Sequence, residues 1–436
     1  MITVARSVRR SGVALAVFAF VLFGSAAAAA AAPAPRDVLQ QALREVRGSD
    51  AAAALSQATA RDLWINGRDA DAPPYGRNVF AFSAQAADAL QRAAGGTTAI
   101  ALILAADRDL AEEVIAQAHG GTAASLATAR SALSAGDRQA HTGNPAAAVD
   151  LYAKAWQLAY GALARLVASK VTTVPSAPLA AAAEQALAGT RFGMSGPKIE
   201  QSLPPLTAGG KPEVFYAGSE ACPFCGVQRW GMIVALSQFG TFSNLHLMQS
   251  ILATPPQVTT FTFFGSSYRS PYVSFVPVEV WSNVPAHPGL VPLQSLTDPE
   301  SKLLHRFDPS VETPFIDVAN RFVIDSSTVD PHLITHKSWT QLAGALTDPN
   351  NISTQAIAGE AEVFTAELCI ATGGNPQSVC ASTVVQQYEA ALPTLTGRGG
   401  SCPAPPPPGG PPPARDPATS GSSRPGPVAV AARCQG

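Results

Sequence analysis

The stretch VFYAGSEACPFCGVQRWGMIVALSQFG, residues 214–240, decides the fold of this 436-residue chain. Its first residues are apolar and β-prone, which predicts a strand, and glycine and serine then break the run. From Pro223 onward, apolar side chains recur at helical spacing as far as Gly240, which predicts a helix. Proline suits the first position of a helix because that position needs no backbone N–H. We therefore expect Cys222 at the start of a helix, shortly after a strand.

The centre of this stretch is a C-x-x-C motif, Cys222-Pro223-Phe224-Cys225. A thiol at a helix N-terminus lies beside unpaired N–H groups and the positive end of the helix dipole, which favour the thiolate and lower its pKa from about 8.5. Cys225 follows three residues later on the same face and can attack a mixed disulfide formed at Cys222. The motif therefore predicts a redox-active cysteine pair that needs no bound cofactor, with Pro223 and Phe224 tuning its chemistry.

Other interpretations of these residues compete with the redox one. A zinc half-site would need a second close cysteine pair, but the remaining cysteines show no C-x₂₋₄-C spacing. A locked structural disulfide between Cys222 and Cys225 is the other alternative. His332 and His336 lie four residues apart near an expected helix start and could suit a metal, but two surface histidines are the simpler interpretation. We therefore predict no metal site.

The N-terminus has the pattern of a secretory signal. Basic residues, including Arg9 and Arg10, precede an apolar run, and small residues follow as far as Ala32. We expect residues 1–32 to be a signal peptide or an uncleaved membrane anchor, since the apolar stretch is just long enough to span a bilayer. The rest of the chain is then secreted, periplasmic or on the cell surface, where disulfides persist.

Amino-acid composition and the positions of glycine and proline indicate the domain organisation of the rest of the chain. The formal net charge of −2 gives no electrostatic indication of nucleic-acid binding. Residues 33–190 are rich in alanine and predict an all-helical domain, with one helix hairpin over 125–166 that resembles a tetratricopeptide repeat. Proline and glycine predict a linker over 191–211 and a disordered tail over 397–436. Between them, residues 212–396 predict a domain of strands and helices, so that the fold class is α+β or α/β.

Within 212–396, the pattern predicts specific elements. Residues 258–264 and 273–281 read as two strands, interpreted as an inserted hairpin. A second hairpin is expected around the two-residue turn Ala319-Asn320, directly after Thr313-Pro314. The chain then turns helical. Helices are expected over 331–346, 354–371 and 376–392.

The four other cysteines fall into two pairs by position. Cys369 ends one expected helix and Cys380 opens the next, so they can lie within disulfide reach, and we favour a structural bridge over a second redox couple. Cys402 and Cys434 flank the proline-rich tail. They could bond to each other, bond to another chain or stay reduced, and the sequence does not decide.

The order of these features over about residues 212–395 resembles the thioredoxin-like superfamily. More narrowly, the segments CPFCGVQRWGMIVALSQFG, TFTFFGSSYRSPYVSF and TPFIDVANRFVI, with the Cys369/Cys380 pair, resemble a secreted thioredoxin-like family known as domain of unknown function 929. The resemblance implies a thiol–disulfide oxidoreductase with Cys222 as nucleophile and Cys225 as resolving cysteine. It also implies that Pro314 is a cis-proline facing them and that the backbone of Thr313 pairs with substrate.

Several residues depart from thioredoxin itself. Ala221 replaces the usual tryptophan, Pro-Phe replaces Gly-Pro between the cysteines, and Tyr216 stands where a buried carboxylate would help the second cysteine, with Glu213 and Glu220 as poor substitutes. The direction of catalysis is therefore open among oxidation, reduction and isomerisation. We expect Cys222 to be exposed and Cys225 shielded.

Two functions follow as expectations. The first is an enzyme acting on protein thiols and disulfides outside the cytoplasm, recharged by an unidentified redox partner. The alternative is a non-enzymatic binding module on a thioredoxin-like scaffold, with Cys222 and Cys225 joined in a structural disulfide.

Overall fold

The computed structural model describes residues 32–46, 49–65, 68–73, 75–93, 96–189, 197–200, 202–251, 257–286, 289–395 and 402–403. From Ala34 onward, the described residues form one compact unit. The expected signal and nearly all of the expected tail lie outside the described residues. Among the helices within them, each is too short or too polar to cross a lipid bilayer.

The alanine-rich N-terminal part is helical, as its composition predicts. Its described helices are α1 (Pro35–Glu45), α2 (Ser49–Ala58), α3 (Arg77–Arg92), α4 (Thr97–Gln117), α5 (Ala123–His141) and α6 (Pro145–Thr172), with the short turn η1 (Arg61–Leu63) after α2. The expected hairpin of α5 and α6 is present, and its turn uses Gly143 with a φ of 78°. The aromatic side chains of Tyr152, Trp156 and Tyr160 on α6 are buried in the core.

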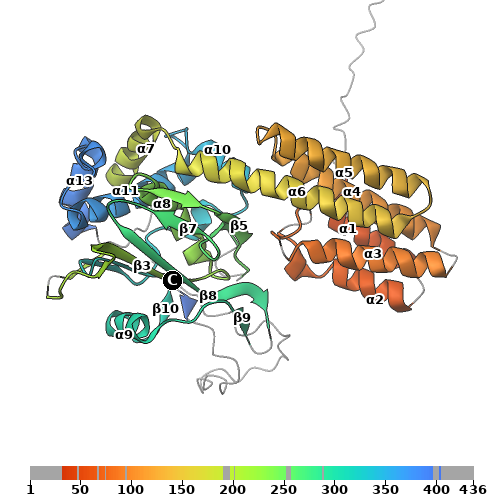
Figure 1. Ribbon diagram of the computed structural model, residues 1–436, viewed down its shortest axis with the longest axis horizontal. Coiled ribbons are helices and arrows are strands. Elements are labelled where there is room, and N and C mark those ends of the chain that lie inside the picture. The colour runs from red at the N-terminus through yellow and green to blue at the C-terminus, as the bar shows by residue number, and fades with distance from the viewer. Residues whose placement is uncertain are drawn as a thin grey trace, which may run out of the picture. The chain divides into compact units, whose positions relative to one another are not determined.

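Helix α6 links this helical part to the rest of the chain (Figure 1). It is 28 residues long, and near its middle the ring of Tyr160 meets that of Trp339 at a centroid distance of 5.9 Å. The next helix, α7 (Ser176–Ala188), packs on α11 (Ile352–Ala371). The hydroxyl of Tyr388 donates to the carbonyl of Ala183 at 2.8 Å. Helix α7, although within 33–190, therefore belongs to the helices that cover the sheet.

A mixed sheet forms the centre of the second half of the chain. Among the described residues its strand order is β1 (Lys198–Ile199), β12 (Phe322–Ile324), β11 (Phe315–Val318), β3 (Lys211–Ser219), β8 (Ser274–Pro285) and β9 (Leu290–Pro292), with β2 (Thr207–Ala208) pairing the start of β3. Strands β3 and β8 are parallel, and the other pairs are antiparallel. The class is therefore mixed α+β.

The prediction of a linker over 191–211 is wrong where the structure describes it. Strand β2 forms a hairpin with β3 around Gly209 and Gly210, which have φ values of 58° and 76°. Strand β1 pairs with the edge of β12. Glycine and proline in this stretch mark turns between short strands, because positive φ suits glycine as well in a hairpin as in a linker.

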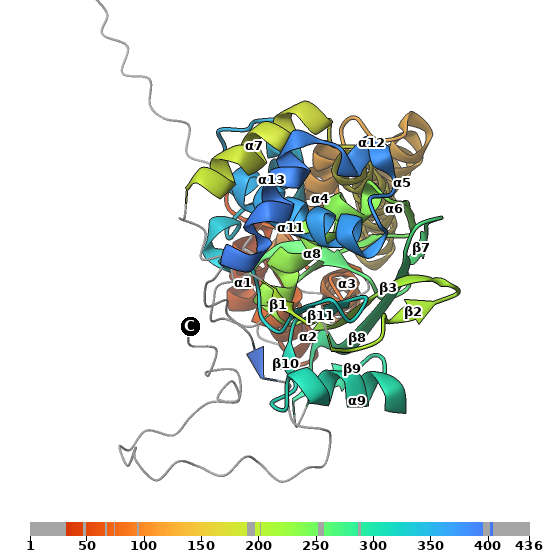
Figure 2. The ribbon, with the colours of Figure 1, turned by 90° about the vertical axis from the view of Figure 1, so that its left-hand side faces the viewer.

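Alternation along β3 builds a layer on each face of the sheet. Val214 and Tyr216 join the core that contains α8 (Pro223–Ser237) and α11. Phe215 and Ala217, pointing the other way, join a second core with Leu304 of α9 (Asp298–Phe307). Figure 2 shows α7, α8, α11 and α13 (Thr383–Ala391) over one face and α9 over the other.

The two expected hairpins have different outcomes. The interpretation of 258–264 and 273–281 as one hairpin is wrong: β6 (Thr259–Thr262) pairs with β5 (His246–Gln249), whereas β8 pairs with β3. The residues between them contain β7 (Ser267–Arg269), which pairs with β4 (Thr241–Ser243). The second hairpin is confirmed, since Ala319 and Asn320 have φ values of 58° and 54° between β11 and β12.

The C-terminal helices also differ in part from expectation. The helix expected over 331–346 is interrupted: a short turn, η3 (Pro331–Leu333), is followed by α10 (Trp339–Ala345), which Ser338 and Gln341 cap reciprocally. His332 and His336 therefore do not share a helix. Helix α11, α12 (Gln377–Cys380), α13 and η4 (Leu392–Thr394) follow, and a disulfide joins Cys369 to Cys380 as expected.

Candidate functional site

Cys222 is the N-cap of α8, directly before Pro223 in the first turn. Its backbone is extended, and its sulfur accepts a hydrogen bond from the backbone N–H of Cys225 at 3.5 Å. That N–H is one of the donors that the first turn of a helix leaves without an internal partner. The helix thus supplies a donor and the positive end of its dipole to this sulfur, and both favour a thiolate there.

A distant part of the chain closes the other side of Cys222. Its thiol contacts the carbonyl oxygen of Thr313, as donor, at 3.6 Å. Thr313 ends the short strand β10 (Glu312–Thr313), and the peptide bond to Pro314 is cis, as the resemblance implied. Strand β11 begins at the next residue and pairs Phe315 with Ala217 of β3. The pairing of β11 with β3 therefore brings Thr313 to the start of α8.

The expectation that Cys222 is exposed is wrong. Its exposed fraction is 1%, and Cys225 is fully buried. The two cysteines and Phe224 form a small buried cluster of their own, and Thr313, itself buried, lies against Cys222. The sequence places Cys222 at the open end of a helix but does not reveal that a strand ninety-one residues later covers it. The two sulfurs are not joined to each other in a disulfide.

Cys225 is shielded, as expected. Burial raises the pKa of its thiol well above the ordinary value, and the neighbouring Cys222 raises it further. The positive charge of Arg229 and a backbone hydrogen bond from Ser219 lower this pKa, but they do not offset burial. A thiol of this kind holds its proton and is a poor first nucleophile, so exchange chemistry would begin at Cys222.

A buried ion pair behind the motif was missed by the sequence interpretation. Arg229, one turn after Cys225 on α8, donates to both carboxylate oxygens of Glu279 on β8, at 2.9 and 2.7 Å. It also donates to the carbonyl of Ser219 at 2.9 Å, and both charged side chains have no exposed surface. An arginine within a largely apolar helix was the available signal, because a buried guanidinium needs a paired carboxylate.

Glu220 lies two residues before Cys222 and is buried. Burial, and next the charge of Glu279, raise its pKa from an ordinary 4.5 to about 7. Hydrogen bonds from Thr262 and from the backbone of Asn283 oppose this rise. A carboxyl with such a pKa exchanges its proton near neutral pH, within the loop that carries the motif.

The helical part of the chain reaches the surroundings of this carboxyl. The side-chain amide of Asn283 donates to Asp71 at 3.3 Å and to the carbonyl of Gln249 at 3.0 Å. Burial, and next the charge of Glu220, raise the pKa of Tyr75. The turn-rich segment between η1 and α3 thus contacts the strands next to the motif, a connection that the sequence interpretation did not include.

The C-terminal tail also reaches the site. Strand β13 (Cys402–Pro403) pairs antiparallel with β10, and its register sets Cys402 opposite Thr313 and Pro403 opposite Glu312. Figures 1 and 2 both show β13 beside β10. The sequence left the state of Cys402 open, because nothing local indicates which part of the chain the tail would meet.

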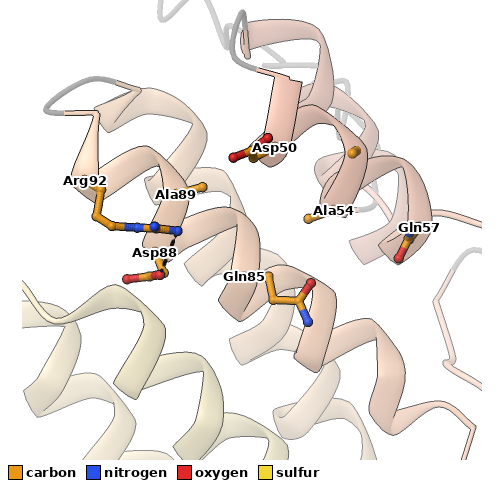
Figure 3. Close-up of a pocket in the computed structure, with 8 residues that line it drawn as sticks. Asp50, Ala54, Gln57, Gln85, Asp88, Ala89 and Arg92 are labelled. Atoms are coloured by element: carbon orange, nitrogen blue, oxygen red, sulfur yellow. Dashed lines mark ion pairs between the residues drawn. The ribbon is translucent and has the colours of Figure 1, made fainter.

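A shallow depression in the helical part is unrelated to the cysteines (Figure 3). Its volume is about 290 Å³. It lies between α2 and α3 and is lined by Asp50, Ala53, Ala54, Gln57, Gln85, Asp88, Ala89 and Arg92. Arg92 forms an exposed ion pair with Asp88 at 3.2 Å.

In the described part of the chain, no group of three or more histidine, cysteine or acidic side chains is arranged to hold a metal ion.

The fold and site together define an α+β domain with a buried C-x-x-C pair at a helix start, closed by a strand that ends in Thr313. Residues 198–286 match the model of a protein family described as Domain of unknown function (DUF929). The match runs from β1 through β8 and includes Cys222 and Cys225. Comparisons with curated proteins and with solved structures gave no match.

Proposed function

We propose that this protein is an exported thiol–disulfide oxidoreductase that uses Cys222 and Cys225 on a thioredoxin-like domain. Its substrates would be protein thiols and disulfides outside the cytoplasm, and a separate redox partner would restore the pair after each turnover. Cys222 is the nucleophile in this proposal and Cys225 the resolving cysteine. No cofactor beyond the cysteines is required.

One observation carries the proposal: the sulfur of Cys222 lies between the N–H of Cys225 and the carbonyl of Thr313, at 3.5 and 3.6 Å. Both thiols are buried, but the N–H of Cys225 and the helix dipole favour a thiolate on Cys222, whereas the neighbouring Cys222 adds to burial in raising the pKa of Cys225. The two cysteines thus have unequal roles. Cys222 attacks a substrate disulfide, and Cys225 then attacks the mixed disulfide and releases the substrate.

The order of elements supports the thioredoxin-like part of the proposal. Strand β3 leads into α8 with the cysteines, β8 runs parallel to β3, and Thr313–Pro314 opens the β11–β12 hairpin before the C-terminal helices. This is the order on which the resemblance rests. Pro314 faces the cysteines in this proposal, and Thr313 offers its backbone to an extended substrate.

Two features support export. The sequence of residues 1–32 has the pattern of a secretory signal. The disulfide between Cys369 and Cys380 is of a kind that persists in oxidising compartments and is rare in the cytosol. The reaction would therefore take place in the periplasm, at the cell surface or outside the cell.

The burial of Cys222 favours the rival function. A nucleophile with an exposed fraction of 1% does not meet a folded substrate without some movement of its surroundings. In the rival function the domain binds a partner without catalysis, and the two cysteines form a structural disulfide.

Turnover assays separate the two functions. We expect the full chain to catalyse insulin reduction by a small dithiol or the refolding of scrambled ribonuclease. Cys222→Ser should abolish this activity, whereas Cys434→Ser, which alters a cysteine to which the proposal gives no role, should keep it. Equal slow rates for the wild type and Cys222→Ser would support the binding module instead.

A further inference from the structure

We propose that Cys402 is a third redox cysteine, which forms a disulfide with Cys222, and that β13 occupies the edge of β10 where an extended substrate would pair. This inference rests on the proposed oxidoreductase function and deepens it. It gives the enzyme an internal thiol that takes the place of a substrate cysteine.

Backbone register places Cys402 at the site. Cys402 is the direct partner of Thr313, and residues opposite each other in antiparallel strands have Cα atoms about 4.5 to 5.5 Å apart. The carbonyl of the same Thr313 contacts the sulfur of Cys222 at 3.6 Å. Thr313 is therefore a common neighbour of the two cysteines.

The sequence around Cys402 keeps the pairing of β13 with β10 short. Pro403 follows at once and has no backbone N–H, so it cannot continue the ladder as a donor along β10. Glu312 is the residue opposite Pro403, and β10 itself has only two residues. Of the two positions in β13, Cys402 is thus the one set opposite the residue that contacts Cys222.

The chemistry is a balanced thiol–disulfide exchange. Starting from the Cys222–Cys225 disulfide, the thiolate of Cys402 attacks the sulfur of Cys222. A Cys402–Cys222 bond forms as the Cys222–Cys225 bond breaks, and Cys225 leaves with the electron pair and takes a proton from solvent. No external oxidant is consumed. The same step lets Cys402 release a small thiol bound to Cys222.

The test uses the full chain carrying Cys225→Ser, with oxidised glutathione as the probe. Glutathione on Cys222 should be displaced by Cys402, and digestion without reduction followed by mass spectrometry should join the peptides of Cys222 and Cys402 within one chain. A tethered thiol acts at an effective concentration of about 1 mM, so at about 10 μM protein the release should be about 100-fold faster than in Cys225→Ser/Cys402→Ser. Cys225→Ser/Cys434→Ser is the matched control and should behave like Cys225→Ser.

The outcomes separate this inference from the proposed function. Two results would overturn the role of Cys402 alone. In the first, the mixed disulfide between glutathione and Cys222 forms but lasts equally long with and without Cys402. In the second, Cys222 forms its disulfide with Cys434 instead. Failure of Cys222 to take up glutathione in every variant, with no exchange in the wild type, overturns the oxidoreductase function and this inference together.

Discussion

At the scale of single residues, Glu220 makes the protein sensitive to pH. Its pKa is raised to about 7, chiefly by burial, so between pH 4.5 and 7 the folded protein holds a proton that the unfolded chain has released. Stability is therefore fully present below about pH 4.5 and is lost as the pH rises through 7. The loss from this one group is at most about 3 kcal/mol. Asp317 and Glu362, whose burial also raises their pKa values to about 7, act in the same direction.

We predict that Glu220→Gln reduces this pH dependence. Urea unfolding at pH 5 and pH 8 should show the wild type less stable at pH 8, and the variant should lose less stability between the two pH values. Glu184→Gln, at an exposed position on α7, is the control and should leave the pH dependence unchanged. A wild type that is more stable at pH 8 than at pH 5 would contradict the assignment.

Arg229 and Glu279 form a buried ion pair next to the C-x-x-C motif. Each is fully buried, and the two share two hydrogen bonds, so each charge has its partner where water is absent. The pair joins α8 to β8, and Arg229 also joins α8 to the end of β3 through its hydrogen bond to the carbonyl of Ser219. Its positive member lowers the pKa of Cys225, although burial has the stronger, opposite effect, so it acts on the cysteine that we propose as the resolving one.

At the scale of elements, the disulfide between α11 and α12 is a local clamp. Cys369 and Cys380 are separated by 11 residues. The chain-entropy model gives about 2.5 to 3 kcal/mol for closing such a loop. We predict that Cys369→Ala/Cys380→Ala lowers the free energy of unfolding by about this amount, measured by denaturant titration. Insulin reduction should continue under conditions where the variant stays folded, and loss of turnover in a folded variant would show that this bridge also serves in catalysis.

Some secondary-structure elements and contacts could be predicted from the sequence, and others could not. Local sequence patterns predicted the features that depend on residues close together in the chain: the strand–C-x-x-C–helix unit, the Ala319-Asn320 hairpin and the disulfide between two helix ends. The partners of β6 and β8 were not predictable, because alternation fixes the face of a strand and not its neighbour. The cover over Cys222, the Arg229–Glu279 pair and the β10–β13 pairing join residues 91, 50 and about 90 positions apart. Such contacts depend on the topology of the fold, which local sequence patterns do not predict.

At the scale of the whole molecule, the described residues from Ala34 onward unfold, we predict, as one cooperative unit. Helix α6 connects the helical part with α10 through Tyr160 and Trp339, and Asn283 connects β8 with Asp71. Hydrogen exchange followed by mass spectrometry across a urea series should give the same midpoint for peptides from α3 and from β3. Two separated midpoints would contradict this prediction and would support an independent helical domain.

Tyr160 offers a matched pair of variants for the same prediction. Tyr160→Ala should destabilise both parts of the chain together by about 3 kcal/mol, because it removes a large buried ring. Tyr160→Phe keeps the ring and removes a buried hydroxyl that has no hydrogen-bond partner among the described residues, so it should cost no stability. A loss confined to the α3 peptides in Tyr160→Ala would show that the two parts are not coupled.

The central claim is that Cys222 and Cys225 are an exchangeable redox pair, and their reduction potential tests it most directly. The full chain carrying Cys402→Ser is equilibrated in buffers of reduced and oxidised glutathione and quenched with acid. Free thiols are then alkylated, and mass spectrometry measures the fraction of the pair that is reduced. We predict a midpoint less reducing than about −300 mV, within the range of thioredoxin-like oxidoreductases of about −270 to −120 mV. A pair that stays oxidised at potentials below about −300 mV would be a structural disulfide and would contradict the account.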